Sequence, residues 1–178
     1  MPESLAITQR QSLGLATVMA RRGVDATRIG AALELVAPTA PAYVHRDGLA
    51  LVGTGPDSWL AVAEGVMPDW STALTGRLAG LASVFDQTGG YVVFRIAGPG
   101  ARTLLQQGAF IDLHPDAFGP GSAATTVIAH IGVTLWQVDT TPTFDVALFR
   151  SYASSFRHWI AVTAAPLPDG LQTGASRD

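Results

Sequence analysis

Two carboxylates and an imidazole lie within five residues of one another in Asp112-Leu113-His114-Pro115-Asp116. Such a group could bind a metal ion, but one His and two Asp on so short a loop supply few ligands. Asp is also a common turn residue, because its side chain accepts hydrogen bonds from nearby backbone N–H groups. We therefore expect a structural loop, with Asp112 or Asp116 ordering the turn that follows a helix.

Ser154 and His158 are i, i+4 neighbours on the last predicted helix, within reach of each other. No Gly-x-Ser-x-Gly elbow surrounds them and no acid is assigned to orient the imidazole, so the sequence disfavours a hydrolase triad. His130 stands between Ala129 and Ile131 in a predicted apolar strand. We expect it to be a hydrogen-bonded core histidine rather than a base.

The Gly98-Pro99-Gly100-Ala101-Arg102 segment joins a predicted strand to a helix, a junction that can aim N–H groups at an anion. It lacks the Lys-Ser/Thr of a nucleotide loop and the third glycine of a dinucleotide fingerprint. A tight turn with Pro99 at the first helical position is the better interpretation. The four Trp residues are predicted core or interface anchors. The sequence thus assigns no catalytic, cofactor-binding or metal-binding residue.

Composition limits the function classes. The chain has 178 residues, a net charge of −3, no cysteine, 48% apolar residues and 14% charged residues. It has no basic run for nucleic acid, no thiol for disulfides or metals, no signal core in Met1–Arg10 and no apolar run of the ~18 residues that span a membrane. We expect a cytoplasmic protein. The low charge favours a large partner interface, the alternative being an Ala- and Gly-rich domain with a bland surface.

Residues 1–40 are predicted to form an N-terminal helical arm. One apolar stripe at helical spacing stops at Gly23, and a second follows Asp25, a predicted N-cap, and stops before Pro38. We expect five residues of the arm to pack partly on another subunit: Leu15, Val18, Met19, Ile29 and Leu33. The alternative is that the arm folds back on the sheet of its own domain.

Residues 41–165 are predicted to form a single α+β domain, and residues 166–178 a disordered tail. The expected sheet is mixed or antiparallel, with helices on one face. Its predicted strands are Leu49–Thr54, Trp59–Glu64, Tyr91–Ala97, about 124–130, 133–138 and 143–149. The predicted helices are about 70–81, one following Gly98 and closing at Gly108, and one beginning near Ser151.

Several segments resemble the sarcosine oxidase gamma subunit family. They run over roughly residues 53–160, and the stretch from Asp112 through Phe118-x-Pro120-Gly121 is the most family-specific. The matching segments are Gly55-Pro56-Asp57-Ser58-Trp59-Leu60, Asp86-Gln87-Thr88-Gly89-Gly90-Tyr91, Gly98 to Arg102, Asp112 to Pro115, Pro142-Thr143-Phe144, and Arg150-Ser151-Tyr152 through His158-Trp159.

The resemblance implies a fold related to the folate-binding domain of glycine-cleavage aminomethyltransferases. It also implies a non-catalytic accessory gamma subunit of a heterotetramer with alpha, beta and delta partners. FAD, FMN, NAD and tetrahydrofolate are then expected in the partner subunits and none in this chain. The complex would demethylate sarcosine, or a related N-methyl amino acid, with hydrogen peroxide formation and one-carbon transfer to tetrahydrofolate.

The second hypothesis is a free-standing folate-binding or one-carbon-transfer domain. Such a domain needs a carboxylate at the end of a strand, in a pocket, to hold the pterin ring. Glu34 and Glu64 are the only Glu residues after Glu3, and neither lies in an identifiable folate motif.

Overall fold

The computed structural model describes residues 5–165 and 172–173. The chain divides into a continuous unit, Gln11–Tyr91, and a discontinuous unit, Met1–Arg10 with Val92–Asp178. Each unit has its own sheet, with helices against one face. The expected α+β class is therefore confirmed, although the strands form two sheets rather than one. Among the described residues, no helix combines the length and apolar character that crossing a membrane requires.

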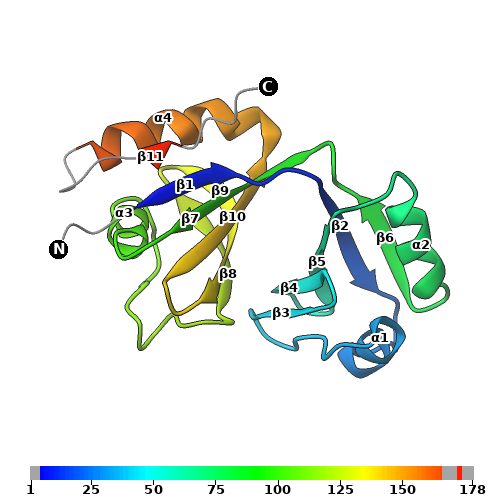
Figure 1. Cartoon of the computed structure of the whole chain (residues 1–178). Helices are drawn as coiled ribbons and strands as arrows, with labels where there is room; N and C mark the ends of the chain where they lie inside the picture. The colour runs from blue at the N-terminus through cyan, green and yellow to red at the C-terminus, as the bar shows by residue number, and fades with distance from the viewer. Residues whose placement is uncertain (1–4, 166–171, 174–178) are drawn as a thin grey trace. The chain divides into compact units, whose positions relative to one another are not determined.

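The continuous unit holds a five-stranded sheet in the order β3-β4-β5-β2-β6, and all the strand pairs described in it are antiparallel. These strands are labelled in Figure 1. Their bounds are Leu13–Ala20 for β2, Tyr43–Arg46 for β3, Leu49–Gly55 for β4, Ser58–Glu64 for β5 and Ala82–Asp86 for β6. The predicted strands β4 and β5 are confirmed to within one residue, because a Gly-Pro-Asp turn between two apolar runs specifies a hairpin.

Two helices pack against this sheet, α1 (Ala26–Leu33) and α2 (Trp70–Arg77). Asp25 caps α1 as predicted, since its carboxylate accepts a hydrogen bond from the N–H of Arg28 at 3.0 Å. The core between helices and sheet is apolar. Its fully buried members include Ile29, Leu78, Leu51, Val18 and Trp59.

The helical arm predicted for residues 1–40 does not form. Its first half is strand β2 and its second half is α1, and both belong to the continuous unit. Apolar residues occur on both faces of β2, so its sequence also matches helical spacing by coincidence. The predicted packing on another subunit is wrong for four of the five residues, which are buried within this chain: Leu15, Val18, Ile29 and Leu33. Met19 is 47% exposed.

The discontinuous unit holds a six-stranded sheet in the order β11-β1-β7-β10-β9-β8. β1 pairs antiparallel with β7 and parallel with β11, while β9 pairs antiparallel with both β8 and β10. The bounds are Ala6–Gln9 for β1, Tyr91–Ala97 for β7, Ala123–Ile128 for β8, Ile131–Asp139 for β9, Thr143–Phe149 for β10 and Gln172–Thr173 for β11. The tail predicted over residues 166–178 lies outside the described residues apart from β11.

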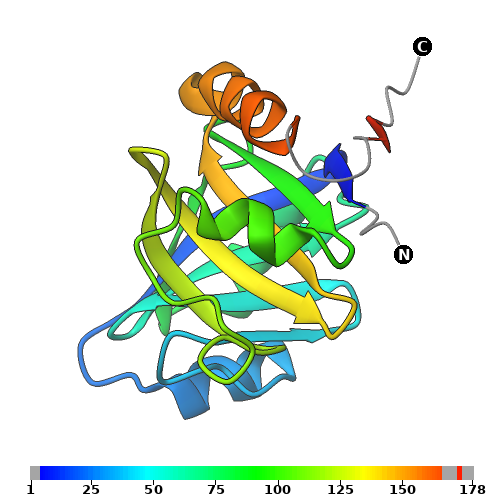
Figure 2. The ribbon, with the colours of Figure 1, turned by 90° about the vertical axis from the view of Figure 1, so that its left-hand side faces the viewer.

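Helices α3 (Ala101–Gln106) and α4 (Ala153–Ala164) cover one face of this sheet, and a short 3-10 turn, Arg150–Tyr152, leads into α4. Figure 2 shows α3 in front of the strands with α4 above it. Alternate residues of β7 point into the core beneath them, as predicted from the strand's period of two. The core includes Val92, Phe94 and Ile96 from β7, Leu104 and Leu105 from α3, and Phe156 and Ile160 from α4.

Candidate functional site

The Asp112 loop is held in place by its own hydrogen bonds and by α3. Asp112 accepts the backbone N–H of His114 at 2.8 Å, which confirms its predicted role in the turn. The N–H of Asp116 donates to Nδ1 of His114 at 3.3 Å. Gln106 binds the loop from the helix, because its Oε1 accepts the N–H of Leu113 at 2.9 Å. The described residues contain no group of three or more His, Cys, Asp or Glu placed to hold a metal ion.

An open pocket of about 440 Å³ lies between this loop and α3, with Asp112 and Arg102 among its lining residues. The guanidinium of Arg102 is already engaged. It donates to the carbonyl of Phe118 at 3.0 Å and to Oε1 of Gln137 at 2.9 Å, and it lies 5.1 Å from the ring centre of Phe144. Burial lowers the pKa of Arg102. This arginine joins helix to sheet, so it is poorly placed to bind a separate anion.

The Gly98 turn serves the backbone rather than an anion. Gly98 has φ +106°, a conformation that favours glycine, and its N–H donates to the carbonyl of Pro142 at 3.0 Å. Helix α3 begins at Ala101 with Gly100 as its N-cap, so Pro99 precedes the cap instead of occupying the first helical position. The tight-turn interpretation therefore fits the structure, with the helix start displaced by two residues.

His130 is not a core histidine, contrary to the sequence prediction. It is exposed in the two-residue turn between β8 and β9, and its ring lies 6.4 Å from that of Phe110. Both turn residues have positive φ, +49° for Ala129 and +66° for His130. Type I′ hairpin turns require that geometry and usually carry Asn-Gly, so Ala-His gave no turn signal in the sequence.

Ser154 and His158 are both exposed on α4. The apolar side of that helix is buried as predicted, through Phe156 and Ile160. Two of the four tryptophans, Trp59 and Trp136, are 1% exposed and pack as interior residues. The structure thus places Ser154 and His158 on the exposed side of α4 and these two tryptophans in the interior.

The segment around residues 38–42 is fixed by two residues of the continuous unit. Nε1 of Trp59 donates to the carbonyl of Pro38 at 2.8 Å, and the N–H of Gly53 donates to the carbonyl of Ala42 at 2.9 Å. A Cβ on Gly53 would lie 2.4 Å from the backbone oxygen of Ala40. The tryptophan of the Gly-Pro-Asp-x-Trp motif in the family resemblance thus has a structural role, because it holds the segment around residues 38–42 in place.

The Asp86-to-Tyr91 motif also builds a turn. The carboxylate of Asp86 accepts the N–H of Thr88 at 2.8 Å, and Oγ1 of Thr88 accepts the N–H of Leu15 at 3.1 Å. The backbone and hydroxyl hydrogen bonds from Thr88, with a smaller one from Ser71, outweigh burial and hold the pKa of Asp86 below its usual value.

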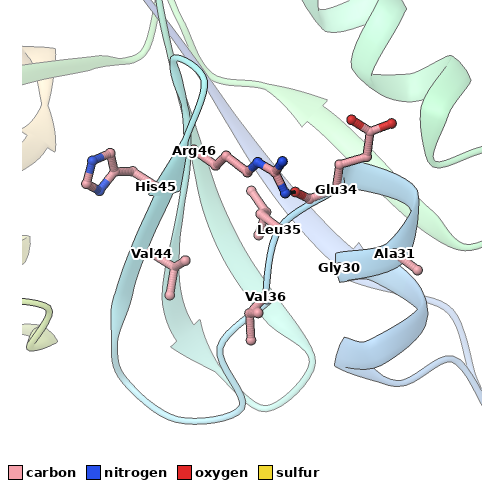
Figure 3. A pocket seen from close by; sticks show the side chains of 8 residues that line it. All are labelled: Gly30, Ala31, Glu34, Leu35, Val36, Val44, His45 and Arg46. Atoms are coloured by element: carbon pink, nitrogen blue, oxygen red, sulfur yellow. Dashed lines mark hydrogen bonds between the residues drawn. The ribbon is translucent and has the colours of Figure 1, made fainter.

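A second open pocket, of about 420 Å³, lies between the end of α1 and strand β3 (Figure 3). Glu34 ends α1 in a left-handed conformation, φ +57°, and its carbonyl accepts Nη1 of Arg46 at 2.8 Å. Figure 3 shows the carboxylate of Glu34 pointing away from Val36 and Val44. Its lining combines apolar residues such as Leu35 with Glu34, His45 and Arg46, and the arginine is bonded to a backbone carbonyl.

Asp145 is a buried charge in the part of the chain that the structure describes, and no sequence pattern singled it out. It lies on β10, is 1% exposed, and is bonded to two arginines of the same unit. Arg95 binds both carboxylate oxygens, at 2.7 Å through Nε and 2.8 Å through Nη2, and Arg10 adds a bond of 3.0 Å. Such a fork is strong and directional. The only sequence signal was a lone Asp inside an otherwise apolar strand.

Solved structures define the class of this fold. Aminomethyltransferase T of the glycine cleavage system from Bartonella henselae matches with a TM-score of 0.68 and 14% identity, covering 89% of this chain and 46% of that one. At that identity the likeness concerns the fold alone. A chain of the heterotetrameric sarcosine oxidase from Corynebacterium sp. U-96, in complex with pyrrole 2-carboxylate, matches with a TM-score of 0.82 and 26% identity, covering 93% of this chain and 86% of that one. The protein is therefore an α+β chain of the aminomethyltransferase-like class.

The chain belongs to the sarcosine oxidase gamma subunit family, because the sequence model of that family matches residues 19–166. A curated sarcosine oxidase subunit gamma from Corynebacterium sp. (strain P-1) is 29% identical over 178 residues, covering 89% of this chain and 85% of the relative. Another, from Corynebacterium sp. (strain U-96), is 31% identical over 163 residues, covering 87% and 78%. These matches confirm the resemblance drawn from the sequence motifs.

Proposed function

We propose that this chain is the accessory gamma subunit of a heterotetrameric sarcosine oxidase-type enzyme. The observation that carries the proposal is the fold match to a chain of a heterotetrameric sarcosine oxidase over 93% of this chain. Alpha, beta and delta subunits are its partners, and FAD, FMN, NAD and tetrahydrofolate bind to them. The complex converts sarcosine or a related N-methyl amino acid, oxygen and tetrahydrofolate into the demethylated amine, hydrogen peroxide and methylenetetrahydrofolate. We further propose a cytoplasmic location.

The arrangement of the polar side chains supports an accessory role. Asp112 and Arg102, which line the pocket beside α3, are engaged in turn and helix-to-sheet contacts. Their hydrogen bonds stabilise the fold, and using them in a reaction would require breaking those bonds first.

A free-standing folate-binding or one-carbon-transfer domain is less well supported. It needs a carboxylate free to bind the pterin, whereas both oxygens of Asp145 are bonded to arginine. Glu34 is exposed, with its carboxylate directed away from the apolar side of its pocket (Figure 3). The shared fold alone does not bring folate binding with it.

Co-expression tests the proposal. The chain, carrying an affinity tag, is produced with the flavin- and NAD-type subunits of the proposed complex. The captured material is assayed for subunit stoichiometry, flavin absorbance and sarcosine-dependent peroxide. We expect the captured complex to contain the four subunits in equal amounts and to show flavin absorbance. A tagged chain that elutes alone, beside a fully active complex of the other three, would refute the proposal. Parallel assays with dimethylglycine and N-methylated proline identify the amine.

A further inference from the structure

Four exposed arginines of the continuous unit form what we call the arginine cluster: Arg21, Arg22, Arg28 and Arg77. The first two lie in the turn between β2 and α1, the third in the first turn of α1, and the last ends α2 (Figure 1). The N–H of Arg21 donates to the carbonyl of Leu81 at 2.8 Å, so this turn lies beside the loop that follows α2. Nε of Arg77 donates to the carbonyl of Ala32 at 3.3 Å. Because Ala32 is one helical turn after Arg28, both residues are on the same side of α1.

The cluster has an excess of positive charge. None of its four guanidinium groups forms an ion pair with a described carboxylate. Within residues 21–33 and 70–81 the only acidic residue is Asp25, whose carboxylate already caps α1 by accepting the N–H of Arg28 at 3.0 Å. Three other exposed carboxylates border these segments: Glu34, Asp57 and Asp69. The four positive charges therefore have no counter-ion within their own segments apart from a carboxylate that is capping the helix.

Arg28 occupies a position where its own helix disfavours a cation. It is the third residue of α1, and the N-terminal end of a helix carries partial positive charge. The first turn contains no acidic residue, although a glutamate three positions after the Asp25 cap would complete a capping box. Arg21 and Arg22 add two further cations just before the same helix end. Local stability thus favours an acidic residue at position 28, and the fold does not explain the arginine.

We propose that the arginine cluster is the surface on which a partner subunit of the oxidase docks, through a carboxylate-rich segment of that subunit. The inference rests on the proposed function, which supplies the partner. Guanidinium groups bind carboxylates through two parallel hydrogen bonds, and protein interfaces are enriched in arginine and depleted of lysine. All 11 basic residues of this chain are arginines. The binding groups are the four side chains and not the end of α1, because Asp25 already caps that end.

Charge disfavours the other occupants of this surface. A second copy that docked through the same surface would place arginine against arginine, and like charges repel across an interface. Three segments of this chain lie outside the described residues, namely 1–4, 166–171 and 174–178, and each has one acidic side chain, which is too few for four arginines. A net charge of −3 over the whole chain opposes binding to nucleic acid.

Reversing one charge of the cluster tests the proposal. Arg28→Glu keeps the backbone N–H that Asp25 binds. Arg157→Glu is the matched control, because Arg157 is also an exposed helical arginine, on α4, and its reversal changes the net charge by the same amount. Each tagged variant is co-expressed with the other subunits, and the amount of partner captured is compared with wild type at about 0.1 M and about 1 M salt. Between these concentrations the Debye length falls from about 10 Å to about 3 Å. The isolated chains are compared by thermal unfolding and gel filtration.

We expect Arg28→Glu to unfold at or above the wild-type temperature, because it improves the first turn of α1. Its capture of partner at the lower salt concentration should fall at least about tenfold, because a like charge then faces the partner's carboxylates. At the higher salt concentration its difference from wild type should shrink. The control should capture partner like wild type at both concentrations.

Capture by Arg28→Glu at the wild-type level overturns the proposal and leaves the proposed function intact. An equal loss for Arg157→Glu, or a loss that salt does not reduce, also overturns it, because the effect is then not specific to the charge of this surface. Self-association of the isolated chain that Arg28→Glu abolishes, with the complex unaffected, makes a second copy the occupant. Failure of the wild-type chain to assemble refutes the proposed function, and the inference with it. If Arg28→Glu does not fold, Arg22→Glu decides by the same assay, because Arg22 is exposed in a turn.

Discussion

Removing the carboxylate of Asp145 should destabilise the discontinuous unit strongly. The carboxylate is 1% exposed and connects three segments, since Arg95 lies on β7 and Arg10 directly follows β1. Asp145→Ala removes the buried carboxylate that both guanidinium groups share. Asp145→Asn keeps the shape but removes the charge, so we expect it to lose most of the same stability.

The structure sets the size of the effect. Breaking a buried ion pair by removing one partner costs about 3–5 kcal/mol. The side chains of Arg10 and Arg95 are 16% and 33% exposed, so water reaches both of them in part and the lower end applies. We therefore expect a loss of about 3 kcal/mol for Asp145→Ala. In a protein of this size, that corresponds to a fall in melting temperature of about 6–12 °C.

Urea unfolding of the purified chain, followed by tryptophan fluorescence, measures this loss. Trp136 pairs with Asp145 across the β9–β10 ladder, so the probe reports on the perturbed region. Asp47→Asn is the control, because the Arg46–Asp47 pair is exposed by 62% and 87%, and such pairs contribute little to stability. If the free energies of unfolding of both Asp145 variants lie within about 0.5 kcal/mol of the wild-type value, the cluster does not stabilise the unit as we infer.

Three further changes test other parts of the structure. Gly53→Ala places a methyl group 2.4 Å from a backbone oxygen and should cost about 2–3 kcal/mol in denaturant unfolding, whereas Gly55→Ala, with open space around it, should be close to neutral. Replacing Ala129-His130 by Asn-Gly should raise the free energy of unfolding by about 1–2 kcal/mol, because both positions have positive φ; an unchanged or lower midpoint would argue against strain in this turn. The pKa of Asp86 is lowered in the folded state, so its ionised form contributes stability above the unfolded-state pKa of about 3.9, and this stability is lost as pH falls through the folded-state pKa. Asp86→Asn should therefore melt at a lower temperature than wild type at pH 7 and at the same temperature at about pH 2. A constant difference in melting temperature between these pH values would contradict the assignment.

Sequence patterns predicted the elements whose period was unambiguous. Tyr91–Ala97 is a continuous apolar run bounded by turn residues and is strand β7, and Asp25 with the residues after it forms a capped helix. The strand Leu13–Ala20 was predicted as a helix because its apolar residues occupy both faces. The sequence predicts one sheet, whereas the structure has two. The strands β3 and β6 give no sequence signal because they are short and half-polar, without a clear alternation.

The buried Asp145 cluster could not be predicted, because it depends on long-range contacts that a single sequence does not display. Asp145 has its partners 50 and 135 residues away, so local pattern could at most indicate that a buried charge needs one. His130 was placed in a core strand because nothing in Ala-His suggests a turn.

The insertion of one unit between β1 and the rest of its sheet has a consequence for the order of folding. During synthesis β1 emerges before its neighbour β7, which follows only after residues 11–91 have been made, a delay of roughly 4–16 s at typical elongation rates. Closing so long a loop adds little thermodynamic cost, yet it slows the formation of non-local pairs. The strands β4 and β5 are consecutive in the chain, so their pairing involves no such delay. Pulsed hydrogen exchange during refolding should therefore show amide protection in β4 and β5 before β1, and the first strand of the chain should be among the last to be paired.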